Sequence, residues 1–220
     1  MTKVKICGLT RPADTRAAVE AGADLVGCIV HPQSKRAVRV DDLPEVMAPA
    51  SARAARVAVV VDPDDALAAT LASSGAVDWL QLHGEETAER VVDLKRRTGL
   101  RMIKALAVAT GEDVDQAEAV GSVADLVLFD ARPAPGAPRG GNGLAFDWRL
   151  LDGLAAASYP WGLAGGLDPS NVAGAIGRTG AGLVDVASGV ETAPGQKDHD
   201  AIRAFVSAAK RRQERAEEPA

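Results

Sequence analysis

The feature that most constrains the fold of this chain is the regular alternation of short apolar segments with helical segments. Eight segments rich in valine, leucine and isoleucine each precede a turn and then a stretch with helical spacing. They predict strands over residues 4–7, 24–30, 56–61, 77–82, 102–106, 125–129, 161–164 and 183–187. Alternating strands and helices imply a parallel sheet that helices cover. Eight such units predict a single closed (βα)8 barrel, a TIM barrel of the α/β class.

The length of 220 residues suits one domain of this size. The intervening segments predict helices that include residues 40–50, 87–99, 112–120 and 146–157, and a last helix over 199–210. We expect the barrel domain to span residues 1–210 and the charged segment 211–220 to fray. The loop 131–144 is rich in glycine and proline, and we expect it to move until substrate orders it.

Composition excludes several classes of partner. A net charge of −5 and an aromatic content of 3% do not favour nucleic-acid binding. No apolar run approaches about 18 residues, so no membrane span is predicted, and the amino terminus lacks the pattern of a signal peptide. The two cysteines, Cys7 and Cys28, lie in predicted strands without metal-ligand spacing. We therefore expect a cytoplasmic protein without a metal site.

The stretch 163–191 is built from two successive strand, loop and helix units. Gly165–Gly166 ends the first strand, after which Asp168 is expected to cap a helix whose first residue is Pro169. Ser188–Gly189 ends the second strand. Two small-residue loops side by side would point backbone N–H groups at one anion, and phosphate usually binds to the loops after strands 7 and 8 of such a barrel. Two ordinary turns are the alternative.

Chemically capable residues stand at the predicted carboxyl ends of the strands, where barrel enzymes place their active sites. They are Cys7, His31, Asp62, His83, Asp130, Asp185 and Ser188. Among these, a Cys7 thiolate can abstract a carbon-bound proton while an Asp130 carboxylic acid donates one to a leaving oxygen. Such a pair suits an isomerisation. The alternative is that Cys7 is a small buried hydrophobe and Asp130 a helix cap.

Two further residues have both a binding and a structural interpretation. Arg36 can bind a carboxylate through two parallel hydrogen bonds, or it can be a solvated charge in a basic loop. His83 can contact a ligand or serve as a structural histidine. Cys28 is interpreted only as a buried strand residue.

With these residues in view, the sequence resembles the phosphoribosylanthranilate isomerases, barrel enzymes of tryptophan biosynthesis, to about residue 206. The matching motifs occur in order along the chain. They are Lys5-Ile6-Cys7-Gly8-Leu9-Thr10, Ser34-Lys35-Arg36, Gln81-Leu82-His83-Gly84-Glu85, Leu128-Phe129-Asp130, Gly140-Gly141-Asn142-Gly143, Phe146-Asp147-Trp148, Leu163-Ala164-Gly165-Gly166-Leu167 and Val184-Asp185-Val186-Ala187-Ser188-Gly189-Val190-Glu191. The chain departs from the usual family pattern at Ala37, Asn142 and Ala187.

The resemblance implies a role for each candidate residue. Cys7 would be the general base and Asp130 the general acid, and Arg36 would bind the anthranilate carboxylate. The substrate pocket would include His83 and Asp185. The ribose 5-phosphate would be held by Gly141, Gly165, Gly166, Ser188 and Gly189, with the loop that contains Gly141 and Asn142 closing over the site.

The implied reaction is the Amadori rearrangement of N-(5-phosphoribosyl)anthranilate to 1-(2-carboxyphenylamino)-1-deoxyribulose 5-phosphate. It needs no cofactor and no metal. The only partner implied is the small phosphorylated sugar substrate, and the protein is expected to be a monomer or homodimer.

Two other functions stay open at this point. An isomerase of histidine biosynthesis, or a dual-specificity enzyme, performs the same rearrangement in a related barrel. Such barrels resemble two half-barrels with two phosphate sites and use an aspartate after strand 1, where this chain has Cys7. The other is a phosphate-binding barrel without catalysis, against which the presence of both Cys7 and Asp130 argues.

Overall fold

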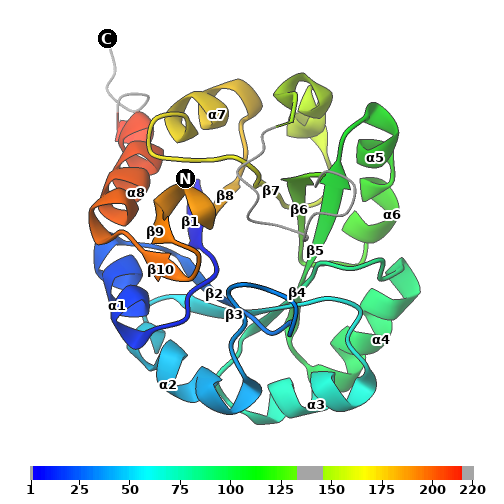
Figure 1. Cartoon of the computed structure of the whole chain (residues 1–220). Helices are drawn as coiled ribbons and strands as arrows, with labels where there is room; N and C mark the ends of the chain where they lie inside the picture. The colour runs from blue at the N-terminus through cyan, green and yellow to red at the C-terminus, as the bar shows by residue number, and fades with distance from the viewer. Residues whose placement is uncertain (1, 133–145, 215–220) are drawn as a thin grey trace.

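The computed structural model describes residues 2–132 and 146–214, and it confirms the predicted barrel. Eight parallel strands close in chain order, with β1 paired to both β2 and β8. Figure 1 shows them as an inner ring surrounded by helices. The strands are β1 (Lys3–Ile6), β2 (Leu25–Ile29), β3 (Ala55–Val60), β4 (Trp79–Leu82), β5 (Arg101–Val108), β6 (Leu126–Ala131), β7 (Trp161–Leu163) and β8 (Leu183–Val186).

The barrel has two apolar layers because its strands are covered on both faces. A small cluster fills the interior, and it consists of Leu25, Val57, Ile103, Ala105, Leu128, Ala164 and Leu183. A larger cluster packs between the outer faces of the strands and the helices. The interior is thus a packed core, which leaves the ends of the barrel as the places where a ligand can bind.

Within the described residues, five helices of eight residues or more cover the outside of the barrel. They are α1 (Pro12–Ala21), α3 (Asp65–Ser73), α4 (Ala88–Thr98), α7 (Val172–Thr179) and α8 (His199–Glu214). Three of them end at a glycine in the left-handed conformation, namely Gly22, Gly99 and Gly180, which is a common way to end a helix. In Figure 1, α8 lies beside α1 and so brings the last helix next to the first.

Three predicted helices are broken in the structure. Residues 40–50 form a 3₁₀ turn, the short helix α2 (Leu43–Met47) and a second 3₁₀ turn, because Pro44 and Pro49 restrict regular hydrogen bonding. Residues 112–120 are divided at Gln116 into α5 (Gly111–Asp115) and α6 (Ala117–Gly121). The prediction of a helix over 146–157 is wrong. Two 3₁₀ turns, Trp148–Leu151 and Leu154–Ala156, flank Gly153, whose φ of 97° is outside the helical region.

The start of α7 also corrects a prediction. Asp168 accepts hydrogen bonds from the backbone N–H groups of Ser170 and Asn171, at 2.7 and 3.1 Å. Its side chain therefore holds a turn, and the helix begins only at Val172, with Asn171 as its cap and Pro169 outside it. This local bonding pattern of aspartate competes with a helix cap.

A hairpin that the sequence analysis did not predict follows β8. Residues Ser188–Val190 form a 3₁₀ turn, and the two short antiparallel strands β9 (Glu191–Ala193) and β10 (Gln196–Lys197) come next. Figure 1 shows this hairpin inside the ring of helices, close to β1 and β8. It supplies two charged residues to the site described below, Glu191 and Lys197.

The remaining expectations concern the ends and the long loop. Helix α8 continues to Glu214, four residues into the segment predicted to fray. Residues 215–220 and the loop residues 133–145, which include Gly141 and Asn142, lie outside the described residues. None of the helices in the described part of the chain is long and apolar enough to cross a membrane.

Candidate active site

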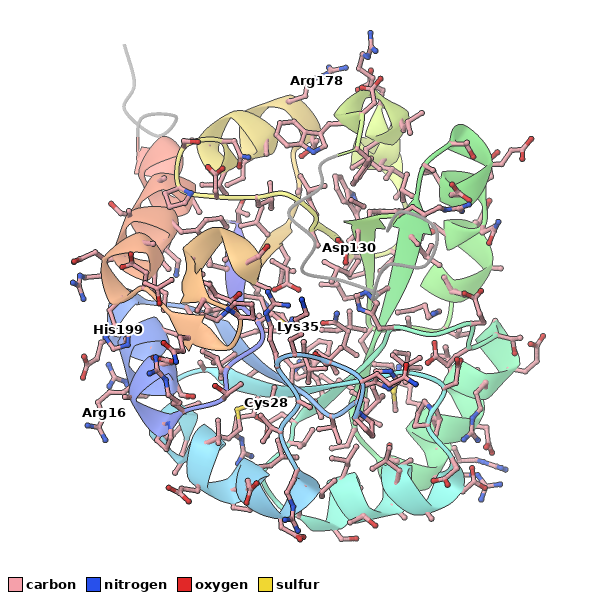
Figure 2. The ribbon with its side chains drawn as sticks, in the orientation of Figure 1. Arg16, Cys28, Lys35, Asp130, Arg178 and His199 are labelled. Carbon is pink, nitrogen blue, oxygen red and sulfur yellow. The ribbon has the colours of Figure 1, made fainter. Side chains whose placement is uncertain are left out.

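The candidate residues gather at the carboxyl end of the barrel. Cys7 follows β1 directly and His83 follows β4. Asp130 is the second-last residue of β6, and Asp185 lies in β8. Figure 2 shows Asp130 toward the middle of the ring, whereas Arg16 and Arg178 point outward from it. The strand-end prediction for these four side chains thus agrees with their positions.

Cys7 is a buried free thiol at the seam that closes the barrel. Its exposure is 6%, and its backbone N–H donates to the Val186 carbonyl at 2.8 Å. Burial raises the pKa of the Cys7 thiol, and the nearby ammonium groups of Lys5 and Lys197 oppose that rise. Cys28, by contrast, lies fully buried in β2, where burial raises its pKa. Lys5 lowers the pKa of both thiols, whereas Lys197 lowers that of Cys7.

A buried ion pair involves Lys5, which stands two residues before Cys7 in the chain. The Lys5 Nζ is 2.8 Å from the Asp185 Oδ2, and both side chains are buried. Burial is the largest influence on the pKa of Lys5 and lowers it, but the charges of Asp185 and Cys7 together outweigh burial and raise the pKa. The other Asp185 oxygen, Oδ1, is buried and accepts no hydrogen bond from the described residues. An unsatisfied acceptor at the end of β8 suits a contact with a substrate hydroxyl.

Asp130 is held between the backbone and His83. Its Oδ1 accepts the N–H of Ala131 at 2.8 Å, and its Oδ2 is 3.3 Å from the His83 Nε2. On the other side of the imidazole, the Gln81 amide nitrogen is 3.0 Å from Nδ1. A Gln81 N–H donated to Nδ1 places the ring proton on Nε2, facing Asp130. His83 thus lies between Gln81 and Asp130 and contacts both side chains.

The loop that carries His83 is fixed by a second buried ion pair. The Lys104 Nζ is 2.8 Å from the Glu86 Oε2 and donates to the Gly84 carbonyl at 2.7 Å. The Glu86 carboxylate also accepts the N–H groups of Gly84 and Asp62. These contacts bind the loop after β4 to the ends of β3 and β5, so His83 is presented by a rigid turn.

Arg36 is not a solvated charge. Its guanidinium makes two parallel hydrogen bonds to Glu191, Nε to Oε1 at 2.8 Å and Nη2 to Oε2 at 2.7 Å. The Lys197 Nζ lies 2.8 Å from Glu191 Oε1 and also donates to the Ala187 carbonyl at 2.8 Å. Among the described residues, none accepts a hydrogen bond from the Arg36 Nη1. This edge of the guanidinium suits a second carboxylate.

The two predicted phosphate loops pack against each other. Gly165 and Gly166 have φ angles of 85° and 63°, which favour glycine. A Cβ on Gly165 would lie 2.6 Å from the Ala131 nitrogen, and a Cβ on Gly189 would overlap the Leu167 carbonyl oxygen. The missing side chains therefore allow the loop after β8 to approach the loop after β7. The backbone N–H groups of such glycine loops are suited to binding an anion.

Gly189→Ala is expected to raise the KM for a phosphorylated substrate about tenfold, as for loss of one hydrogen bond to a charged group. The added methyl group must separate the two loops, because it would otherwise overlap Leu167. Gly174→Ala in α7 is the matched control, since a Cβ there meets no atom within 4 Å. Steady-state kinetics on both variants decide the matter. An unchanged KM for Gly189→Ala would show that loop contact is not needed for phosphate binding.

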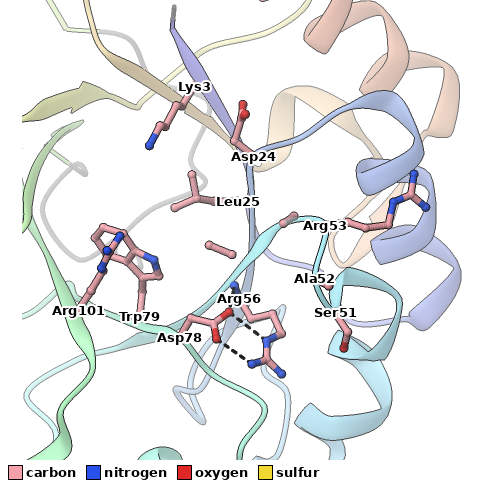
Figure 3. Close-up of a pocket in the computed structure, with 12 residues that line it drawn as sticks. Lys3, Asp24, Leu25, Ser51, Ala52, Arg53, Arg56, Asp78, Trp79 and Arg101 are labelled. Carbon is pink, nitrogen blue, oxygen red and sulfur yellow. Dashed lines mark hydrogen bonds and ion pairs between the residues drawn. The ribbon is translucent and has the colours of Figure 1, made fainter.

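A separate hollow lies at the opposite, amino-terminal end of the strands (Figure 3). Two of its arginines have neighbours as partners: Arg56 pairs with Asp78 at 2.7 Å, and Arg101 stacks over the Trp79 ring at 5.2 Å. In barrels this face serves stability. The hollow is therefore distinct from the candidate active site.

Sequence reasoning missed several residues of the site, namely Lys5, Gln81, Lys104, Glu191 and Lys197. Lys5 and Gln81 stand two residues before Cys7 and His83, so strand alternation would have placed each pair on one face. Glu191 is the last residue of the motif that begins at Val184, but the motif alone assigns it no role. Lys197 had no signal in the sequence, because its place depends on the unpredicted hairpin.

Comparison with known proteins agrees with this geometry. Residues 4–208 match the family model described as N-(5'phosphoribosyl)anthranilate (PRA) isomerase. A relative of that name from Paramagnetospirillum magneticum is 47% identical over 209 residues, covering 94% of this chain and 97% of the relative. Another, from Rhodopseudomonas palustris strain BisB5, is 49% identical over 212 residues, covering 96% and 97%.

Solved structures give the same result. The phosphoribosyl anthranilate isomerase of Thermotoga maritima superposes with a TM-score of 0.86 at 35% identity, covering 96% of this chain and 99% of that one. A structure of such an isomerase in complex with reduced 1-(o-carboxyphenylamino)-1-deoxyribulose 5-phosphate has a TM-score of 0.84 at 34% identity, with the same coverage. A further structure describes monomers generated from the dimeric Thermotoga maritima enzyme, with a TM-score of 0.83 at 34% identity and the same coverage.

Proposed function

Because the chain belongs to the N-(5'-phosphoribosyl)anthranilate isomerase family, we propose that Cys7 and Asp130 are the base and the acid of that reaction. The protein is an isomerase of tryptophan biosynthesis, which converts N-(5-phosphoribosyl)anthranilate to 1-(2-carboxyphenylamino)-1-deoxyribulose 5-phosphate. The observation that carries the proposal is the position of the two groups. A thiol after β1 and a carboxyl group in β6 stand at the same end of one barrel.

The proposed reaction begins at Asp130. Its carboxylic acid protonates the ring oxygen of the ribose, and the ring opens to a Schiff base. The positive charge on the imine nitrogen makes the neighbouring C2′ proton acidic, and the Cys7 thiolate removes it. The electron pair left on carbon forms an enolamine, which tautomerises to the ketone. The contact between the His83 Nε2 and the Asp130 Oδ2, at 3.3 Å, restricts the orientation of the Asp130 carboxyl group.

We propose that Arg36 binds the anthranilate carboxylate through the guanidinium edge that contains Nη1. The other edge is held by Glu191, which is itself fixed by Lys197. The guanidinium is therefore immobilised before substrate arrives, which reduces the entropy lost on binding. His83 and Asp185 complete the pocket, with the Asp185 Oδ1 accepting a substrate hydroxyl.

Arg36→Ala is expected to raise the KM about tenfold or more while changing kcat less, since a charge-assisted bidentate contact is lost from the bound substrate. Arg39→Ala is the matched control, because Arg39 lies in the same loop but its side chain is exposed. Its ion pair with Asp41, at 3.5 Å, is at the surface and contributes little to stability. The control should have wild-type kinetics. An Arg36→Ala variant with an unchanged KM would contradict the assignment.

For the phosphate we propose the N–H groups of the loops that contain Gly165, Gly166, Ser188 and Gly189. Their support is the close packing of the two loops at Gly189 and the positive φ angles of Gly165 and Gly166. Gly141 remains a proposal on the basis of the family resemblance.

The test of this function is the loss of anthranilate-derivative fluorescence when the purified protein meets freshly generated phosphoribosylanthranilate without added metal or cofactor. Decay faster than background hydrolysis is expected. The histidine-pathway substrate, offered in parallel, should not be converted, because the strand 1 position that carries an aspartate in those enzymes is Cys7 here. Phosphoribosylanthranilate that decays no faster than the background would contradict the proposed function.

Two further proposals concern the state of the protein. We propose a monomer or a homodimer, and light scattering after size-exclusion chromatography distinguishes them; a larger particle would contradict both. We also propose the cytoplasm as its compartment, because both cysteines are free thiols. Fractionation of cells that express the protein tests this.

A further inference from the structure

Lys5 lies inside the barrel on the same face of β1 as Cys7. Side chains two residues apart on a strand share a face, and the side chain of Lys5 has an exposure of 0%. Lysine is almost never fully buried unless its charge is paired. The reaction described above gives this ammonium no part, although it stands beside the proposed base.

The partner of Lys5 fixes it in place across the barrel seam. Lys5 and Asp185 are register partners of β1 and β8, and the Nζ is 2.8 Å from Oδ2. Because the carboxylate belongs to the neighbouring strand, the ammonium cannot move without breaking a buried pair. The charge of Lys5 is thus held at a constant position relative to the end of β1.

A glycine lets the ammonium and the thiol share one small space. A Cβ on Gly27, in β2, would lie 3.2 Å from the Cys7 Sγ and also 3.2 Å from the Lys5 Nζ. The two atoms therefore border the same point inside the barrel. Only a residue without a side chain leaves this space open to both.

Two of the other cations near Cys7 share one carboxylate partner. The sulfur is faced by the cations Lys5, Arg36 and Lys197, by the anion Asp185 and by the neutral thiol Cys28. Arg36 and Lys197 both bind Glu191. Burial is the largest influence on the pKa of Cys7 and raises it, whereas Lys5 is the largest influence that lowers it.

We propose that Lys5 is a positioning residue for Cys7: its ammonium, held by Asp185, stabilises the thiolate that removes the substrate's C2′ proton. In that step the proton passes from C2′ to the Cys7 sulfur, and the electron pair of the C–H bond enters the enolamine. Lys5 keeps its own proton throughout. The inference rests on the proposed role of Cys7 as the base.

The test is Lys5→Gln, which removes the charge and keeps a side chain of similar length. Alkylation of Cys7 by iodoacetamide is followed against pH, with the modified peptides resolved by mass spectrometry. The midpoint should rise by about one pH unit or more, as for loss of an opposite charge near an ionising group. At a fixed pH below the midpoint, alkylation should be about tenfold slower. In a plot of kcat against pH, the acidic limb should also move to higher pH.

Lys104→Gln is the matched control. It also breaks a buried lysine–carboxylate pair, of 2.8 Å with Glu86, but on the His83 side of the barrel. It should leave the alkylation midpoint of Cys7 unchanged. A folded Lys5→Gln variant with a wild-type midpoint overturns the inference, and so does a Lys104→Gln variant with an equal shift.

If Lys5→Gln does not fold, the double variant Lys5→Gln/Asp185→Asn avoids an uncompensated buried charge. Its midpoint should lie above that of the single variant Asp185→Asn, which keeps the Lys5 ammonium, because Lys5 lowers the pKa of Cys7; equal midpoints in these two variants overturn the inference. Alkylation needs no turnover, so its result is separate from the proposed function. An active Cys7→Ala variant would instead refute the base role, and the inference with it.

Discussion

Cys7→Ala is expected to lower kcat by about 10²–10⁴-fold, the range for loss of a positioned general base. Binding of the phosphorylated product should persist, because the proposed contacts to the phosphate and the carboxylate come from other strands. The thiol is the proposed proton acceptor at the end of β1, and alanine cannot accept a proton. Steady-state kinetics with fluorescence detection, combined with calorimetric titration of product, measure the two effects separately.

Cys28→Ala is the matched control for this prediction. Cys28 is also a buried free thiol, but it lies within β2. Its replacement removes only a small core side chain and should leave kcat unchanged. A Cys7→Ala variant that retains kcat within a few-fold of wild type would contradict the proposed role of Cys7, because another group would then have to accept the proton.

Asp130→Asn is expected to cause a loss in kcat of the same size, about 10²–10⁴-fold. An amide cannot donate the proton that opens the ribose ring. The substitution keeps the side-chain shape and an oxygen that can accept the Ala131 N–H, so folding should be retained. Thermal denaturation verifies the fold, and steady-state kinetics measure the loss.

Asp62→Asn is the control, because Asp62 is another aspartate at a strand end. Its Oδ1 accepts the Glu85 N–H at 2.8 Å, a contact that asparagine can also make. We expect wild-type kcat. Equal losses in the two variants would mean that Asp130 acts through the loop structure rather than as an acid.

Most of the fold follows from local sequence. Each of the eight strands lies in a short segment rich in apolar residues, and β3, β5 and β6 are examples where buried apolar residues mark the strand directly. The failures have local causes too. Gly153 interrupts the segment after residue 146, and Asp168 forms a turn in place of a cap. The β9–β10 hairpin has strands too short to show an alternating pattern.

The candidate site was predictable only in part. The rule that barrels place active groups at strand ends was sufficient for Cys7, His83, Asp130 and Asp185. Spacing could have indicated Lys5 and Gln81, which stand two residues before Cys7 and His83, but not the contacts between strands that are distant in the chain. Lys5 and Asp185 meet only because the barrel closes between β1 and β8.

Arg36 illustrates the same limit. Its sequence neighbours suggested a basic, solvated loop, yet the side chain is buried against Glu191, 155 residues away. The pairing depends on the hairpin that follows β8. Its consequence is a guanidinium fixed on one edge and available on the other, which the sequence could not indicate.

The central claim, that Cys7 removes the C2′ proton, is tested most directly with substrate deuterated at C2′. Release of deuterium to water is measured by mass spectrometry for the wild type, Cys7→Ala and Cys28→Ala. The account predicts release during turnover by the wild type and Cys28→Ala, and release near the background rate for Cys7→Ala. Deuterium release by Cys7→Ala at the wild-type rate would contradict it and would assign the proton transfer to another group.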